Sequence, residues 1–423
     1  MTPAPENPVT SPAAVAPEAL FFNPFDPAFR EDPYAVYARL REQDPVHQSP
    51  LGIWVLSRYA DCASILRDPR ASSDARNSDQ YKAFEQQAAL DPDAQLFAET
   101  RPFLFMDPPD HTRLRRLVSK AFTPRVVERL RPRVEAIVGE LLDGVAERGE
   151  MDVIANLAYP LPVTVISEML GVPPEDHERF KQWSSELAHS LDPQMTPNPE
   201  LMQRQQAAAD AFRDYFRGLL AERRAEPRDD LLSALVQADE AGDTLTEEEL
   251  LTTCILLLIA GHETTVNLIG NGLLALLRWP DEQRRLRDDP SLARSAVEEL
   301  LRYDPPVQMT VRTALDDIAV GGHTIEKGVQ AVVLLGSASR DPAEFAEPDR
   351  LDITRAENRH IAFGLGIHFC LGAPLARVEG EIALREVLSR FAGLELAAER
   401  PVYKPNIVLR GLESLPVRFD ARV

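Results

Sequence analysis

A long apolar stretch from Thr246 to Trp279 constrains the fold of this 423-residue chain more than any other feature. Thr246 and Glu249 have the spacing of a capping box, which predicts that a helix begins here. Pro280 disfavours helical conformation in the residue before it, so the helix should end at Trp279. Roughly 33 residues at about 1.5 Å each make a helix of about 50 Å, which crosses the whole molecule. So apolar a helix is expected to be buried in protein.

Polar residues interrupt this helix at Ala260-Gly261-His262-Glu263-Thr264. A glycine inside a helix costs about 1 kcal/mol relative to alanine, and the Thr264 hydroxyl can bond back to the carbonyl of Ala260. Several residues that disfavour a buried helix, gathered in one turn of it, indicate a functional site. The alternative is a kink that accommodates packing.

A glycine-rich loop at residues 363–372 is the second constraint. Gly364 and Gly366 permit positive φ values, so the backbone before Cys370 can approach a flat and bulky group. Pro374 suits the first turn of a following helix, which places Cys370 near a helix N-terminus that favours the thiolate. A thiolate among apolar neighbours can be the axial ligand of a haem iron. The alternative is a small buried hydrophobic side chain, the usual role of a lone cysteine.

The pattern Phe-x-x-Gly-x-x-x-Cys-x-Gly in this loop closely resembles the haem-binding signature of the cytochrome P-450 family. Three further motifs resemble those of the family and follow its order: the oxygen-activation motif at residues 260–264, Glu-x-x-Arg at Glu299 and Arg302, and Pro-x-Arg at Pro348 and Arg350. The resemblance covers essentially the whole chain after residue 20. It implies that Glu299, Arg302 and Arg350 form a triad that supports the cysteine loop.

The resemblance implies a mainly α fold with small β-sheets (α+β), in which residues 21–423 form a single monooxygenase domain. Haem b would be buried between the long central helix and the helix that follows Cys370. Residues 1–20 are rich in proline and alanine, and we expect them to form a disordered tail.

The family motifs also imply how the haem is held. The residues expected to contact it are Cys370, Phe363, Ala260, His111, Arg115, Arg312 and His368. Cys370 would ligate the iron, and the two histidines and two arginines would donate charge-assisted hydrogen bonds to the propionates. His111 and Arg115 are spaced i, i+4 and share a helix face, for which a solvated basic face is the alternative.

The implied activity is a monooxygenase reaction that inserts one atom of O2 into an apolar small molecule, by hydroxylation or epoxidation. Thr264 and Glu263 would deliver protons, because a hydroxyl can donate and accept while a carboxylate can relay protons from water. A non-catalytic haem-thiolate carrier or gas sensor is the alternative, but it has no use for this pair. A peroxide-driven variant of the fold would tend to lack it.

Electrons would come from a separate ferredoxin and its reductase, because no flavin or iron–sulfur domain is fused to the chain. The basic residues between Arg113 and Arg133 are unusual in a chain of net charge −21 and are predicted to dock this acidic partner. The same net charge argues against nucleic acid or an anionic membrane as a partner.

A cytoplasmic location is expected from the sequence. The three cysteines are too few and too far apart for a disulfide framework, and they fit a reducing compartment. The N-terminal segment lacks the pattern of a signal peptide or membrane anchor. Substrate specificity is expected in loops at residues 70–105, Leu187–Pro199, Val307–Thr310 and Ile407–Val408.

Overall fold

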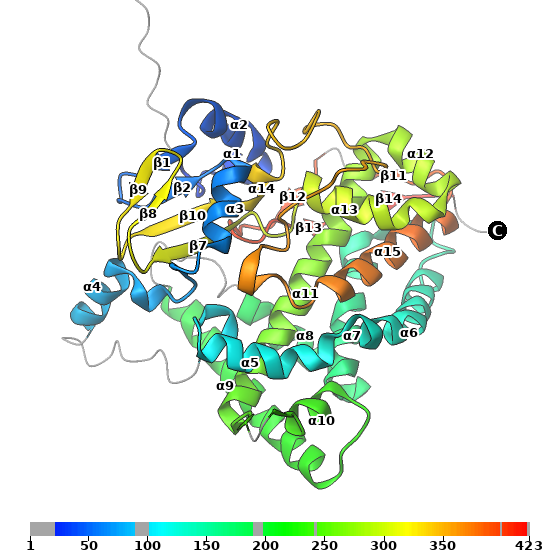
Figure 1. The fold of residues 1–423 in the computed structure, drawn as a ribbon. Helices are drawn as coiled ribbons and strands as arrows, with labels where there is room; N and C mark the ends of the chain where they lie inside the picture. The colour runs from blue at the N-terminus through cyan, green and yellow to red at the C-terminus, as the bar shows by residue number, and fades with distance from the viewer. Residues whose placement is uncertain (1–21, 89–100, 189–197, 241–242, 398–399, 421–423) are drawn as a thin grey trace, which may run out of the picture.

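Helix α11 (Glu247–Arg278) runs through the middle of the computed structural model, and other long helices pack around it (Figure 1). The structure describes residues 22–88, 101–188, 198–240, 243–397 and 400–420. The predicted capping box is present: the Glu249 N–H donates to Thr246 Oγ1 at 3.2 Å, and the Thr246 N–H donates to Glu249 Oε2 at 2.8 Å. Within the described ranges, α11 alone is long and apolar enough to span a membrane, but 78% of its apolar window is buried inside the protein.

The other helices come from both halves of the chain. The earlier ones are α1 (Pro27–Glu31), α2 (Tyr34–Gln43), α3 (Tyr59–Arg67), α4 (Asp79–Ala88), α5 (Asp110–Ser119), α6 (Pro124–Asp143), α7 (Pro160–Met169), α8 (His177–Ala188) and α9 (Pro199–Ala225). The later ones are α10 (Leu231–Val236), α12 (Pro280–Asp288), α13 (Ala293–Tyr303), α14 (Leu335–Ala338) and α15 (Ala373–Arg390). Helix α15 contacts α6, α11 and α13, so the helix after the cysteine loop lies directly against the central helix.

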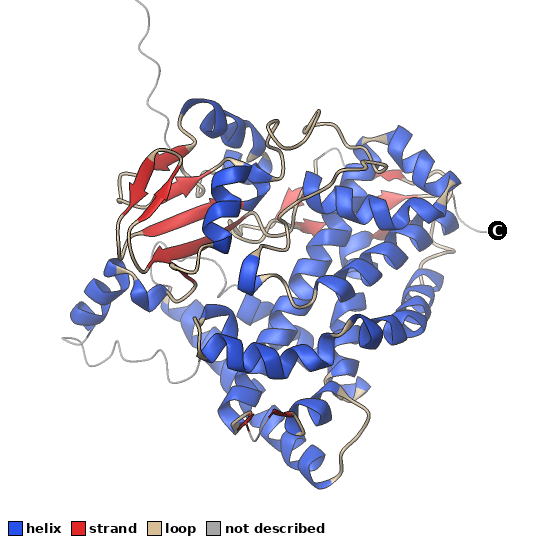
Figure 2. Ribbon diagram, in the orientation of Figure 1, coloured by secondary structure: helices blue, strands red, loops and turns tan. Residues whose placement is uncertain are grey.

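The strands form small sheets beside the helices (Figure 2). The five-stranded sheet has the order β1 (Val46–Gln48), β2 (Trp54–Leu56), β10 (Gln330–Leu334), β7 (Met309–Ala314) and β3 (Ala71–Ser72). Strand β10 runs parallel to β2 and antiparallel to β7, where Ala331 pairs with Arg312. The sheet therefore fixes the position of Arg312.

Shorter strands make up the remaining sheets. They are β4 (Glu150–Asp152) with β14 (Pro416–Arg418) and β11 (Glu395–Leu396), β5 (Asp239–Glu240) with β6 (Asp243–Thr244), β8 (Ile318–Val320) with β9 (His323–Ile325), and β12 (Val402–Tyr403) with β13 (Leu412–Ser414). One hydrophobic cluster runs from Phe103 to Phe419 and joins helices of both halves around α11. The predicted fold class, mainly α with small β-sheets, is confirmed.

The predicted long loop at residues 70–100 is wrong for its first part. Residues 71–72 form β3, and α4 follows from Asp79 because the Ser78 hydroxyl caps it by accepting from the Tyr81 N–H at 3.1 Å. Residues 89–100 lie outside the described part of the chain. The same holds for the expected tail at residues 1–20 and for most of the expected loop at Leu187–Pro199.

Candidate active site

Glycines shape the loop that carries Cys370. Gly364 and Gly366 have positive φ values of 69° and 70°. A Cβ on Gly366 would lie 2.5 Å from the carbonyl oxygen of Leu66, at the end of α3, so glycine is required there. The Cys370 N–H closes the loop by donating to the Phe363 carbonyl at 2.9 Å. The loop is thus held in one conformation against α3.

Cys370 lies three residues before the start of α15 and is exposed, whereas Cys62 and Cys254 are buried. Desolvation of the sulfur within the loop raises the pKa of the Cys370 thiol, while the backbone N–H of Gly372 and the Arg115 guanidinium act in the opposite direction. The helix N-terminus therefore favours the thiolate, as the sequence predicts, but desolvation is the larger effect. A thiolate at this position would be stabilised by a bound metal ion.

Two histidines from separate segments meet beside the cysteine loop. The rings of His111, in the first turn of α5, and His368 have centroids 4.1 Å apart. Both nitrogens of His111 and Nε2 of His368 are buried and have no hydrogen-bond partner among the described residues. Burial and the neighbouring His111, Arg312 and Arg115 lower the pKa of His368 to about 3. Arg115 also donates through Nη2 to the Phe369 carbonyl.

Arg312 joins this group from β7. Its guanidinium donates to the Val311 carbonyl at 2.8 Å and to Thr310 Oγ1 at 3.1 Å. Burial lowers the pKa of Arg312 to about 10, and the nearby Asp107 carboxylate only partly opposes this. The carboxylate of Asp107 already accepts from the Ser73 N–H at 2.9 Å.

The structure therefore gathers His111, Arg115, Arg312 and His368 next to the exposed Cys370, as the sequence predicts. Three of the histidine nitrogens lack an acceptor within the described residues, and desolvation disfavours the charge on the Arg312 side chain. Such a set of donors fits a ligand with two carboxylates and a metal that binds thiolate, which is the chemistry of haem.

The polar segment of α11 does not break the helix, which is continuous from Glu247 to Arg278. The Thr264 hydroxyl donates to the Ala260 carbonyl at 2.9 Å, as predicted. A Cβ on Gly261 would lie 3.6 Å from Ile166 of α7, which is ordinary contact, so packing does not require glycine at this position. The helical hydrogen bonding of α11 therefore continues through the polar segment.

Glu263 is buried and has a partner that the sequence did not suggest. Lys404 Nζ lies 2.5 Å from Glu263 Oε1, and His262 Nε2 lies 3.8 Å from Glu263 Oε2. Burial lowers the pKa of His262, whose Nδ1 contacts the Leu258 carbonyl at 2.8 Å. Lys404 follows β12 and is 141 residues away along the chain, so no local pattern could have revealed the pair.

A second buried acid links the two helices of the site. Glu379 of α15 is 1% exposed and is hydrogen-bonded to the Thr265 side chain of α11. Burial raises the pKa of Glu379 to about 8. Thr265 in turn donates to the Gly261 carbonyl at 3.1 Å. The sequence signal for this residue is an acid within the apolar pattern after Cys370.

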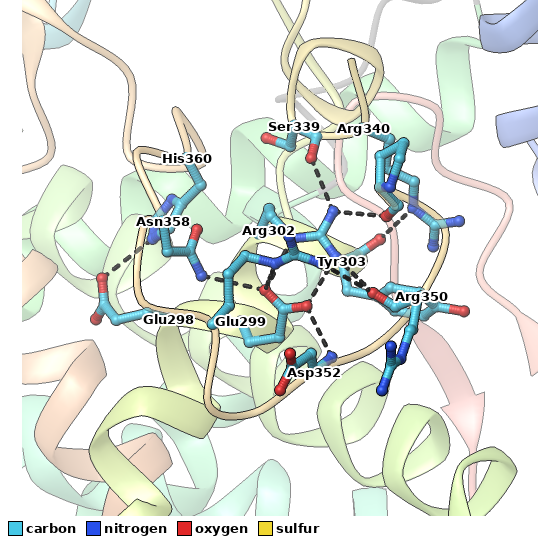
Figure 3. Close-up of polar contacts among 12 residues, drawn as sticks. Glu298, Glu299, Arg302, Tyr303, Ser339, Arg340, Arg350, Asp352, Asn358 and His360 are labelled. Atoms are coloured by element: carbon cyan, nitrogen blue, oxygen red, sulfur yellow. Dashed lines mark hydrogen bonds and ion pairs between the residues drawn. The ribbon is translucent and has the colours of Figure 1, made fainter. Parts of the chain in front are cut away.

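The Glu-x-x-Arg motif of α13 is fully buried, but its predicted triad is wrong in one member (Figure 3). Glu299 receives Arg302 Nε at 2.8 Å and Arg355 Nε at 3.0 Å. The side chain of Arg350 points to Glu347 at 3.3 Å, and only its carbonyl contacts Arg302. Arg350 faces outward because the next residue, Leu351, takes the buried position. The network ties the segment before the cysteine loop to α13.

The predicted basic docking surface is partly neutralised within the protein. Arg113 pairs with Asp243 at 3.1 Å and also with Glu249, at the start of α11. Arg131 pairs with Glu381 at 3.1 Å, and Arg133 pairs with Glu168 at 2.7 Å. By contrast, Arg125 and Arg129 on α6 are exposed. A charge available to a partner is thus expected at these two residues rather than at Arg113.

Two of the segments expected to set specificity lie side by side. Val307 and Leu409 form an isolated antiparallel bridge, and the Gln308 N–H donates to the Val408 carbonyl at 2.9 Å. The loop between β12 and β13 thus lies beside the residues just before β7.

Comparison with known proteins identifies the family. The family model described as Cytochrome P-450 matches residues 45–411. The polyketide biosynthesis protein PksS of Bacillus subtilis is 43% identical over 413 residues, covering 95% of this chain and all of PksS, and the PksS structure matches with a TM-score of 0.85. The monooxygenase PikC of Streptomyces venezuelae is 44% identical, covering 92% of each chain.

A third relative is known with a small molecule bound. The crystal structure of a Bacillus megaterium cytochrome P-450 in complex with testosterone matches with a TM-score of 0.81 at 34% identity, covering 93% of this chain and all of the other. Because the family model and these relatives span nearly the whole molecule, the chain belongs to the cytochrome P-450 family of monooxygenases.

Proposed function

We propose that this protein inserts one oxygen atom from O2 into an apolar small molecule, by hydroxylation or epoxidation, using haem b bound through Cys370. The observation that carries the proposal is the exposed Cys370 beside His111 and His368, three of whose buried nitrogens have no hydrogen-bond partner among the residues that the structure describes. Bound haem would supply the activation of O2, which the electron-donating thiolate promotes. Phe363 and Ala260 would contact the macrocycle.

His111, Arg115, Arg312 and His368 would hold the two propionates. Their donors come from α5, β7 and the cysteine loop, so they would also fix the orientation of the group between α11 and α15. Charge-assisted hydrogen bonds of this kind are stronger than neutral ones and would compensate for the burial of the basic side chains.

Thr264 and Glu263 of α11 would deliver protons to the site of oxygen activation. The Thr264 hydroxyl, now donating to the Ala260 carbonyl, can both donate and accept a proton at Oγ1. The buried carboxylate of Glu263 would relay protons toward it from the solvent side. This pair distinguishes an oxygenase from the alternative, a haem-thiolate carrier or gas sensor.

The substrate would be an apolar small molecule of secondary metabolism; the relative PksS is named as a polyketide biosynthesis protein, which supports this class of metabolism. Electrons would come from a separate ferredoxin with its reductase, docking within the region Arg113–Arg133 at the exposed Arg125 and Arg129.

We also propose that residues 21–423 form one catalytic domain, since one core cluster joins both halves of the chain. The three free cysteines support a cytoplasmic location.

The test is spectroscopic. The purified, reduced protein treated with carbon monoxide should show the red-displaced absorption of sulfur ligation, and Cys370→Ser should lose it while Cys62→Ser keeps it. A colourless wild-type protein would refute the proposal. Thr264→Ala separates an oxygenase, which should lose product and release peroxide, from a sensor, which should bind its gas unchanged.

A further inference from the structure

The Glu263 carboxylate is oriented toward the C-terminal hairpin rather than toward Thr264. Its Oε1 contacts Lys404 Nζ at 2.5 Å, whereas the Thr264 hydroxyl donates to the Ala260 carbonyl. The Glu263 side chain is 7% exposed and that of Lys404 is 20% exposed. The ammonium group is therefore the member of the pair nearer to solvent.

The backbone places Lys404 at α11 without help from its own side chain. The Lys404 N–H donates to the Gly411 carbonyl at 2.9 Å, across the hairpin of β12 and β13. Asn271 Nδ2 of α11 donates to the Arg410 carbonyl at 3.0 Å. A Cβ on Gly411 would overlap the side chain of Asn267, so glycine permits this close approach to α11.

A separate ion pair holds the hairpin from its other side. The buried Arg410 donates through Nε to Asp304 Oδ1 at 2.9 Å, and through Nη2 to the Glu31 carbonyl at 3.1 Å. Since these contacts anchor the hairpin, the Lys404 ammonium is not needed for that purpose. What it does contact is the carboxylate of Glu263.

We propose that Lys404 is a positioning residue for proton delivery, which holds the Glu263 side chain in a fixed orientation at the edge of the site. This inference rests on the proposed role of Glu263. A buried carboxylate that loses its cation is strongly destabilised, so without Lys404 it would turn toward another donor, such as His262. Proton supply to Thr264 would then become slower and less reliable.

The experiment uses the full-length haem protein with a [2Fe–2S] ferredoxin, its reductase, NADPH and testosterone as the probe. Oxygen consumed, NADPH oxidised and hydrogen peroxide released are measured together. The share of consumed O2 that is released as hydrogen peroxide reports how often proton delivery fails, whether or not testosterone is hydroxylated. Peroxide formation takes two electrons per O2 and water formation takes four, so the NADPH oxidised per O2 separates these two outcomes. Lys404→Met should slow oxygen consumption by about tenfold and raise the peroxide share by at least about twofold. Lys404→Arg should restore both to within about twofold.

Glu263→Gln decides whether Lys404 acts through Glu263. In that background, Lys404→Met should have no further effect on the peroxide share. An equal effect in both backgrounds, or an unchanged share in the single variant, overturns the inference. If Glu263→Gln itself behaves as wild type, the proposed role of Glu263 fails first. Should Lys404→Met not retain haem, Lys404→Gln takes its place in the same comparison.

Discussion

The imidazole rings of His111 and His368 lie 4.1 Å apart, and three of their nitrogens have no partner in the part of the chain that the structure describes. Replacing either residue by phenylalanine keeps a ring in place and removes the donors. We therefore expect His111→Phe and His368→Phe each to lower the haem content of the purified protein by about two- to fivefold. The measurement is haem per chain after denaturation.

The exposed ring of His323 on β9 provides the matched control, since His323→Phe should bind haem as the wild type does. A double variant of His111 and His368 with full haem content would refute the role of these residues in holding propionates.

Glu379 predicts a pH dependence of stability. Its pKa is raised from 4.5 to about 8 in the folded protein, so the folded state keeps a proton that the unfolded state loses. The stability from this group is complete below pH 4.5 and is lost as the pH rises through about 8, at no more than about 1.4 kcal/mol per pH unit. Glu379→Gln should flatten this slope. Urea unfolding at pH 6 and pH 8 measures it, and equal slopes in both proteins would contradict the prediction.

The buried network of α13 predicts a contrast between two arginines. Arg355 is 11% exposed and pairs with the fully buried Glu299, whereas Arg350 is 52% exposed. Arg355→Gln should lower the free energy of unfolding by about 3–5 kcal/mol, because it leaves part of a buried charge unpaired. Arg350→Gln should cost no more than about 1 kcal/mol. Denaturant titration measures both, and equal losses would be inconsistent with the triad described above.

The proposed docking surface predicts that reduction depends on Arg125 and Arg129. Reversing both charges should slow the first electron transfer from a [2Fe–2S] ferredoxin by about tenfold at low ionic strength, with a smaller effect in high salt. Arg39→Glu, an exposed change on α2, is the control. Stopped-flow reduction under carbon monoxide measures the rates, and an equal effect of all these changes would exclude specific docking at α6.

Local patterns predicted the elements that depend on neighbouring residues. The capping box at Thr246, the stop before Pro280 and the glycines before Cys370 act within a few residues, and the structure contains each of them. The Ser78 cap is equally local, but the polar composition after residue 70 favours a loop, so helix α4 is not predicted.

Contacts between distant segments could not be predicted in the same way. Lys404 meets Glu263 only because the hairpin lies against α11, and nothing near either residue indicates the other. Motif spacing predicts Arg350 for the triad, whereas the burial of Leu351 turns the Arg350 side chain outward and Arg355 takes this position. Which arginine faces inward is thus decided by packing.

Two polar side chains of α11, those of Glu263 and Asn271, have partners near the C-terminal end of the chain. Glu263 and Lys404 are 141 residues apart, and Asn271 and Arg410 are 139 apart. During synthesis on the ribosome, α11 therefore emerges long before these partners exist, carrying an unpaired carboxylate and an unpaired amide among mostly apolar side chains. The nascent chain cannot complete its core until the hairpin arrives, so a chain stalled before residue 402 would remain a substrate for chaperones.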